Sequence, residues 1–238
     1  MTARTSPNCA RCVKGDCHPP IKAGETPPMD KLAAFCPMKN VPEAIKKAAA
    51  EYARPEVKEF ARQASKQEFE CYERIPEGLR PKNPRILELI QFARKCGYKK
   101  LGLAFCVGLH NEARTLTEIL ENNGFEVVSV CCKVGAVAKE SIGIKPEEKM
   151  AGAENFESMC NPIAQAEILN SEKVDLAVMM GLCIGHDTLF IRYCRVPMTV
   201  IAVKDRVTGH NPLATLYTSS TYYAYLTGRG KKKPPPPF

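Results

Sequence analysis

The pattern of apolar and polar residues changes near residue 100. Before that point, apolar residues recur at helical spacing in three segments, which are 41–51, 55–73 and 85–95. Prolines and glycines between residues 76 and 84 interrupt this pattern. We therefore expect a helical lead-in over residues 41–98.

Beyond residue 100, short apolar runs alternate with amphipathic segments. The apolar runs predict strands at 101–106, 125–132, 174–180 and 197–203. The segments between and after them predict helices at 111–123, 163–170 and 187–193, followed by a tyrosine-rich amphipathic segment at 211–226. Strands that alternate with helices through short connections form a parallel sheet covered on both faces. We expect an α/β core over residues 99–228, built as a three-layer, Rossmann-like sheet of about four parallel strands.

The stretch at 173–189, KVDLAVMMGLCIGHDTL, is the strongest single signal for this core. Its continuous apolar run is typical of a central parallel strand that is buried on both faces. Asp187 is placed to cap the helix that follows. Cys183 and His186 come just after the strand, where open α/β sheets bind their ligands. The stretch therefore predicts a cysteine-based site at the carboxyl edge of the sheet.

The composition is that of an ordinary globular protein, 45% hydrophobic and 25% charged. No apolar run approaches the roughly 20 residues that a membrane-spanning helix needs. The first residues contain no apolar segment of the kind found in secretory signals. We expect a cytoplasmic protein with no membrane partner.

Half of the net charge of +8 lies at the carboxyl end. Residues 229–238 hold four Lys and Arg residues among prolines, which leaves the rest of the chain at +4 (8 − 4). No basic stripe interleaved with aromatic residues appears, so we expect no nucleic-acid partner. The last ten residues predict a disordered, basic polyproline tail.

Twelve cysteines in a chain expected in a reducing compartment indicate metal binding or thiol chemistry rather than disulfides. One group lies in residues 1–40, where Cys9, Cys12 and Cys17 have the spacing C-x2-C-x4-C and Cys36 precedes a proline. Two thiolates of a C-x2-C turn can share a metal, and a third and fourth close a tetrahedral site. The segment is short and poor in apolar residues, so a metal would stabilise its fold. We expect it to hold zinc or a 4Fe-4S cluster.

A second group of cysteines lies at the ends of the predicted strands. Cys106 ends the first strand, Cys132 ends the second, Cys183 follows the third, and Cys160 precedes a helix. In a parallel sheet these positions converge on one edge. Helix N-termini at that edge stabilise thiolates and lower their pKa. Of the adjacent pair, we expect Cys132 rather than Cys131 to face the edge. The last strand and its loop bring further polar residues there, which are Lys204, Asp205 and His210.

Three kinds of chemistry fit this edge. Cys106, Cys132, Cys160 and Cys183 are candidate ligands of a second iron–sulfur cluster or metal, and three of them alone would leave one iron open. Alternatively, Cys183 is a catalytic nucleophile with His186 as its base. A third possibility is that the edge binds a small anion without catalysis. Neither GxGxxG nor GxxxxGK[ST] is present, so no motif supports nucleotide binding.

Several segments of the chain together resemble a known family. They are the four-cysteine start, FCVGLHNEA, SVCCKVG, CNPIAQAEILN, GLCIGHDTLF and VKDRVTGHNP. The combination is similar to a bacterial and archaeal family of cysteine-rich proteins of unknown function that are described as metal-binding. The resemblance extends over nearly the whole chain to about residue 226. It implies metal binding and brings no established reaction with it.

These observations predict a metal-binding protein that uses zinc or iron–sulfur and carries out redox or sulfur-transfer chemistry at the sheet edge, with a small-molecule or redox partner. One alternative is a non-enzymatic module with a structural zinc and a ligand-sensing edge. A weaker alternative is a hydrolase or transferase with a cysteine nucleophile. The sequence leaves open the substrate, the oligomeric state and the choice between zinc and iron.

Overall fold

The computed structural model describes residues 6–13, 17, 21–25 and 32–228. The chain forms two compact units, Met1–Phe69 and Glu70–Phe238. The tail expected at 229–238 lies outside the described residues. Within the described ranges, every helix is too short or too polar to cross a bilayer.

The first unit contains the cysteine-rich segment and two long helices. Its elements are η1 (Cys9–Arg11), α1 (Pro37–Asn40), α2 (Pro42–Tyr52) and α3 (Pro55–Glu70). Each of the three α-helices begins with a proline, whose fixed φ and missing N–H suit the first helical turn. The helices α2 and α3 occupy the segments that showed helical periodicity.

The second unit begins with an element that the sequence pattern did not predict. Strands β1 (Tyr72–Ile75) and β2 (Gly78–Pro81) form an antiparallel hairpin where prolines and glycines had indicated only a break. The strands are too short to show a clear apolar alternation, so turn residues dominate the pattern. Helix α4 (Arg85–Lys95) then forms at the predicted residues.

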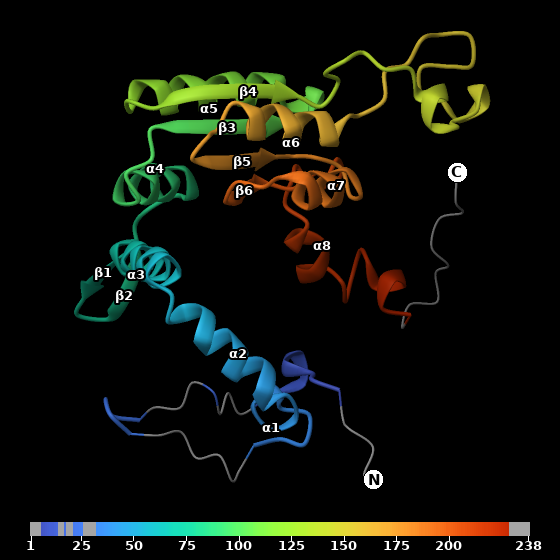
Figure 1. Ribbon diagram of the computed structural model, residues 1–238. Coiled ribbons are helices and arrows are strands. Elements are labelled where there is room, and N and C mark those ends of the chain that lie inside the picture. Colours follow the sequence, from blue (N-terminus) through green and yellow to red (C-terminus); the bar gives the residue numbers. More distant parts are fainter. Residues whose placement is uncertain (1–5, 14–16, 18–20, 26–31, 229–238) are drawn as a thin grey trace. The chain divides into compact units, whose positions relative to one another are not determined.

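A four-stranded parallel sheet lies at the centre of the second unit, in the order β4-β3-β5-β6 (Figure 1). Its strands are β3 (Lys100–Phe105), β4 (Glu126–Cys131), β5 (Leu176–Met180) and β6 (Met198–Ala202). The longer helices that follow the strands are α5 (His110–Asn122), α6 (Pro162–Ser171), α7 (His186–Tyr193) and α8 (Leu213–Tyr217). Short 3-10 helices are η3 (Val107–Leu109), η4 (Lys139–Ile142), η5 (Pro146–Glu148) and η6 (Ala224–Thr227). The predicted α/β class, with four parallel strands, is confirmed.

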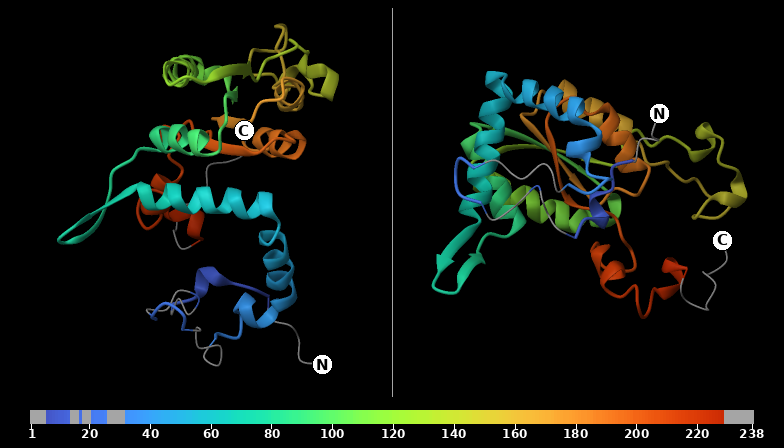
Figure 2. Two further views of the ribbon diagram at one scale, coloured as in Figure 1. Left: turned by 60° about the vertical axis from the view of Figure 1, so that its left-hand side comes forward. Right: turned by 90° about the horizontal axis from the view of Figure 1, so that it is seen from below.

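Helices cover both faces of the sheet (Figure 2). Alternate residues of the central strands pack against the helices of opposite faces. Leu101, Leu103 and Phe105 of β3 share one core with α4 and α5, whereas Ala104 shares the other with α6 and α7. All five residues of β5 are buried, as the continuous apolar run had predicted. The two cores produce the expected three layers, because successive side chains of a strand point to opposite faces.

The order in which the chain adds strands to the sheet reverses between β3 and β5. Strand β4 is added on one side of β3, and β5 and β6 are added on the other side. Helix α5 follows β3 on one face, and α7 follows β5 on the other. Open α/β sheets bind ligands at such a switch point, beyond the carboxyl ends of the strands. Here Gly181 has a φ of 68°, and a Cβ on it would lie 2.0 Å from Cδ1 of Leu109. Glycine is therefore required at the end of β5.

The expected capping of α7 by Asp187 is wrong. The N-cap is Gly185, with a φ of 86°, and no side chain caps the helix. Asp187 lies in the first turn, where its Oδ1 accepts a hydrogen bond from the N–H of Thr188 at 2.7 Å. Its negative charge still favours the amino end of the helix at that position.

Candidate functional site

Three cysteine thiols meet at the carboxyl edge of the sheet. Cys106 follows β3, Cys132 follows β4, and Cys160 precedes α6. The Cys132 thiol lies between the other two and is hydrogen-bonded to both. Its sulfur also accepts the backbone N–H of Val107 at 3.3 Å. We call Cys106, Cys132 and Cys160 the thiol trio. The neighbouring Cys131 packs instead against the two hydrophobic cores.

Backbone hydrogen bonds hold the trio at the strand ends. The N–H of Cys132 donates to the carbonyl of Phe105 at 2.9 Å, which continues the pairing of β3 with β4. The N–H of Asn161 donates to the carbonyl of Cys132 at 2.7 Å. Asn161 also caps α6, since its Oδ1 accepts from Ala164 at 3.2 Å. The segment that carries the third thiol is thereby tied both to β4 and to α6.

A buried glutamine of α6 joins the two strand ends beneath the trio. Gln165 has no exposed surface, and its Nε2 donates to the carbonyls of Phe105 at 3.1 Å and Val130 at 2.7 Å. These carbonyls lie at the ends of β3 and β4, where the chain leaves the ladder. The side-chain amide therefore gives a further donor to two buried carbonyls, of which that of Phe105 also accepts the N–H of Cys132.

The thiols of the trio differ in acidity because they lie in a row. The hydrogen bond with Cys132 and the ammonium of Lys204 lower the pKa of Cys106 to about 5. The hydrogen bond with Cys132 and the charge of Lys133 lower the pKa of Cys160 to about 6. Cys132 itself has a raised pKa, because ionising it would place three negative charges side by side. At neutral pH two thiolates therefore flank one thiol.

Basic side chains face the cysteines of this edge. Lys133 is held by a hydrogen bond from its Nζ to the carbonyl of Ser158 at 2.6 Å. Lys204, in the loop after β6, contacts Cys106. Arg206, in the same loop, contacts Cys183. Among the described residues, none of these three cations forms an ion pair with a carboxylate.

Cys183 has a different partner from the one expected. Its Sγ accepts a hydrogen bond from Nη2 of Arg206 at 3.0 Å. His186, the expected base, donates its backbone N–H to the Cys183 carbonyl at 2.9 Å. Its Nδ1 is buried without a hydrogen-bond partner among the described residues, so this atom forms no hydrogen bond to the Cys183 thiol.

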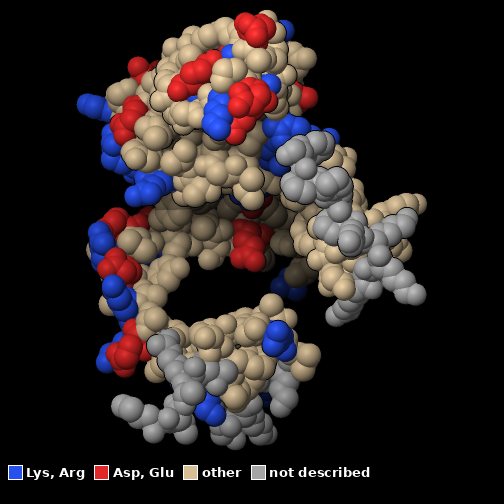
Figure 3. Space-filling view, turned by 90° about the vertical axis from the view of Figure 1, so that its right-hand side faces the viewer, with Lys and Arg blue, Asp and Glu red and all other residues tan. Residues whose placement is uncertain are grey.

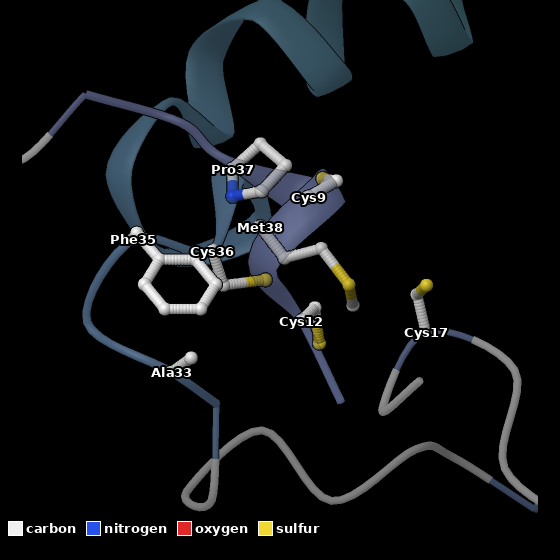
Figure 4. Close-up of a pocket in the computed structure, with 8 residues that line it drawn as sticks. All are labelled: Cys9, Cys12, Cys17, Ala33, Phe35, Cys36, Pro37 and Met38. Atoms are coloured by element: carbon white, nitrogen blue, oxygen red, sulfur yellow. The ribbon is translucent and has the colours of Figure 1, made fainter. Parts of the chain in front are cut away.

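Four cysteines of the first unit line one pocket (Figure 4). Cys9, Cys12, Cys17 and Cys36, which we call the N-terminal quartet, surround a cavity of about 180 Å³. Cys9 begins η1, Cys12 is the C-cap of η1, and Cys36 is the N-cap of α1. The thioether of Met38 also lines the cavity, together with Ala33, Phe35 and Pro37. The four cysteines that were grouped by their spacing in the sequence therefore line one cavity.

The thiol trio and the N-terminal quartet both offer sulfur ligands, but neither is arranged as a complete site for a single metal ion. Within the described ranges, no three His, Cys, Asp or Glu side chains form a group ready to hold a metal ion. None of the twelve cysteines, all of which lie in the described part of the chain, forms a disulfide. The donor chemistry fits zinc or iron–sulfur, because thiolates are soft ligands and the quartet pocket is otherwise lined by apolar residues and a thioether.

Sequence reasoning missed several residues of the edge, which are Lys133, Gln165 and Arg206. In the sequence, a single lysine, glutamine or arginine near a strand end does not indicate whether its side chain is buried or which way it points. Figure 3 shows the face toward which the strands of Figure 1 point, with acidic and basic side chains interspersed in that view. The absence of a nucleic-acid partner stays a prediction.

The sequence of this chain is similar to a protein-family model and to an archaeal protein. Residues 36–201 match the family model DUF1847, whose description is "protein of unknown function". The uncharacterized protein MJ0455 of Methanocaldococcus jannaschii is 47% identical over 150 residues, which are 63% of this chain and 74% of that protein.

Two solved protein structures also align in part with the structure of this chain. Both are crystal structures of Dph2 from Pyrococcus horikoshii, one of them with a 4Fe-4S cluster, and each aligns with a TM-score of 0.34 at 16% identity. The alignment covers 67% of this chain and 34% of Dph2, so the chain spans about a third of that protein. Overlap of this degree carries no information about function. The family match covers more than half of the sequence, and the chain belongs to the DUF1847 family.

Proposed function

We propose that this protein binds metal through two separate thiolate sites, and that the thiol trio holds an iron–sulfur cluster with one iron left open. The observation that carries the proposal is the meeting of Cys106, Cys132 and Cys160, from three distant segments, at the carboxyl edge of the sheet. Ligands of open α/β proteins bind at that place.

The two sites differ in the number of ligands that the chain supplies. The N-terminal quartet has four thiols, which is enough to close a tetrahedral site for zinc or to bind every iron of a 4Fe-4S cluster. The trio has three, so a bound cluster would supply an iron with a free coordination position. Closed metal sites are commonly structural and open ones reactive. We therefore assign stability to the quartet and substrate binding, with redox or sulfur-transfer chemistry, to the trio.

The residues around the trio suit a negatively charged metal–thiolate group. Lys133 and Lys204 compensate the charge of the thiolates they face. Twelve cysteines without a disulfide suit a reducing compartment, which supports a cytoplasmic location.

The test is to purify the full chain under anaerobic conditions and measure iron, sulfide, zinc and visible absorption. We expect a brown protein whose iron and sulfide fall when the trio is changed to serine in C106S/C132S/C160S. The variant C9S/C12S/C17S/C36S should lose only the metal of the quartet. Because Cys131 lies beside Cys132 but packs in the core, C131S is the matched control and should keep its full metal content.

Zinc alone in the wild-type protein would contradict the iron–sulfur assignment. If that zinc is lost only in the quartet variant, the protein is instead a non-enzymatic module with a structural metal. Equal metal content in the wild type and C106S/C132S/C160S would exclude the trio as a ligand set. Circular dichroism of each variant separates loss of ligands from loss of folding.

A further inference from the structure

We propose that Lys204 and Arg206 form an oxyanion site beside the thiol trio, which receives the carboxylate or phosphate group of a small substrate. The anion site is inferred from the contacts of Lys204 and Arg206 alone. Only the use of the site, to hold a substrate next to the open position of the trio, rests on the proposed function.

Both cations reach the switch point of the sheet from the loop after β6. Lys204 extends past the end of β5 toward the segment after β3, where a Cβ on Gly108 would lie 3.2 Å from its Nζ and 4.0 Å from Sγ of Cys106. Arg206 contacts Cys183, which follows β5. The two charges therefore lie over the strands that border the crevice where α/β proteins bind ligands.

Hydrogen bonds within the loop after β6 stabilise its conformation, and the carboxylate of Asp205 takes part in them. Oδ1 of Asp205 accepts the N–H groups of Val207 at 2.9 Å and Thr208 at 3.0 Å. The backbone N–H of Asp205 donates to Nδ1 of His210 at 3.1 Å, and the N–H of His210 donates to the Asp205 carbonyl at 2.9 Å. The carboxylate lies between the two cations in sequence but forms no ion pair with either.

Two cations without a carboxylate partner suit an anionic ligand. A guanidinium donates two parallel hydrogen bonds to carboxylate or phosphate oxygens, and an ammonium adds a point charge. Gly108 adds no side chain beside Nζ of Lys204, from which a Cβ on it would lie 3.2 Å away. An oxyanion held here would place the rest of its molecule beside the thiols.

The site can be tested with two alkylating agents of similar size. Iodoacetate carries a carboxylate and iodoacetamide carries none, and both alkylate a thiolate with loss of iodide. The rate constants at Cys183 are measured by peptide mass spectrometry on the metal-free full chain, and the urea-unfolded chain is the reference. We expect the ratio of the iodoacetate rate to the iodoacetamide rate to be roughly tenfold higher in the folded protein, the effect of a charge-assisted hydrogen bond.

Variants show whether the two cations cause this preference. R206M and K204M should each return the ratio to its value in the unfolded chain, whereas R192M, which removes an exposed arginine of α7, should leave it unchanged. A change in thiolate population affects both reagents equally and cancels in the ratio. A folded-state ratio no higher than in the unfolded chain, or a high ratio that survives in both variants, overturns the proposal.

Competition identifies the source of the oxyanion. Stronger slowing of the iodoacetate reaction by acetate indicates a carboxylate substrate, and stronger slowing by inorganic phosphate indicates a phosphate group. Slowing by neither overturns the site. Since the experiment uses no metal, a protein that binds no cluster but passes this test loses the proposed function and keeps the anion site.

Discussion

The N-terminal quartet and the thiol trio are built in opposite ways. The quartet comes from one short segment, and Cys9, Cys12 and Cys17 are exposed around a cavity with little packed structure. The trio comes from three strand and helix ends, and its central thiol, Cys132, is 1% exposed. Exposed thiols thus line the quartet pocket, whereas packing and backbone hydrogen bonds hold the trio.

This difference indicates a division of labour. A site whose folding depends on the metal gains stability from binding it. A site positioned in advance by a sheet can bind a metal and still leave a coordination position for a substrate, because the scaffold does not require the fourth ligand. The following predictions test this comparison, from the largest expected effect to the smallest.

Removal of metal should unfold the N-terminal segment and leave the second unit folded. Structural zinc contributes about 10–16 kcal/mol in small metal-dependent folds, more than the stability of most domains. After treatment with a chelator, we expect hydrogen exchange of the η1 and α1 amides to become as fast as in an unfolded chain. The amides of β3 and β5 should stay protected. Equal loss of protection in both units would contradict the division.

Gly181→Ala should destabilise the second unit by about 2–4 kcal/mol. The new Cβ would overlap the side chain of Leu109, and the positive φ adds a backbone penalty. Chemical denaturation followed by circular dichroism measures the effect. Gly185→Ala is the control, since its φ of 86° is similar but no atom lies within 4 Å of the added Cβ. A similar loss in both variants would show that crowding at the switch point is unimportant.

Gln165→Leu should destabilise the second unit by about 1–3 kcal/mol and lower the metal content of the trio. Leucine has a similar size but leaves the carbonyls of Phe105 and Val130 without the donor. Denaturation and metal analysis measure the two effects. Gln63→Leu, at a half-buried position of α3 where the amide donates only to the carboxylate of Glu59, is the control. Unchanged metal in Gln165→Leu, with lower stability, would show that this glutamine supports the fold but not the site.

The metal-free protein should titrate thiols at unusually low pH. Because the pKa values of Cys106 and Cys160 are lowered to about 5 and 6, the ultraviolet absorbance of thiolate should begin to rise between about pH 5 and 6. An unfolded chain binds those protons up to its own thiol pKa of about 8.5, so stability should increase with pH between these limits.

Removing one of these thiols tests the origin of the titration. Cys106→Ser should abolish the lower step and reduce the slope of stability against pH, while Cys194→Ser should change neither the step nor the slope. The pKa of Cys194 is raised by burial, so it contributes nothing at low pH. A titration that is the same in both variants would contradict the proposed order of acidity within the trio.

Much of the fold followed from local patterns. The buried run at 173–189 and the alternating segments predicted β5 and its parallel neighbours, because periodicity reports directly on which faces are covered. The β1–β2 hairpin was missed because its strands have four residues each and lie among turn residues. The capping by Asp187 was wrong because α7 already begins at His186, so that its N-cap is Gly185, two residues before Asp187.

The sequence by itself indicated which cysteines belong together in the N-terminal quartet, because Cys9, Cys12 and Cys17 are closely spaced and Cys36 lies in the same cysteine-rich segment. It also determined that other cysteines end parallel strands at a common edge. Only the tertiary structure decided that Cys106, Cys132 and Cys160 touch while Cys183 pairs with Arg206. The reason is that side-chain direction at a strand end depends on register, twist and the path of long loops, none of which leaves a local signal in the sequence.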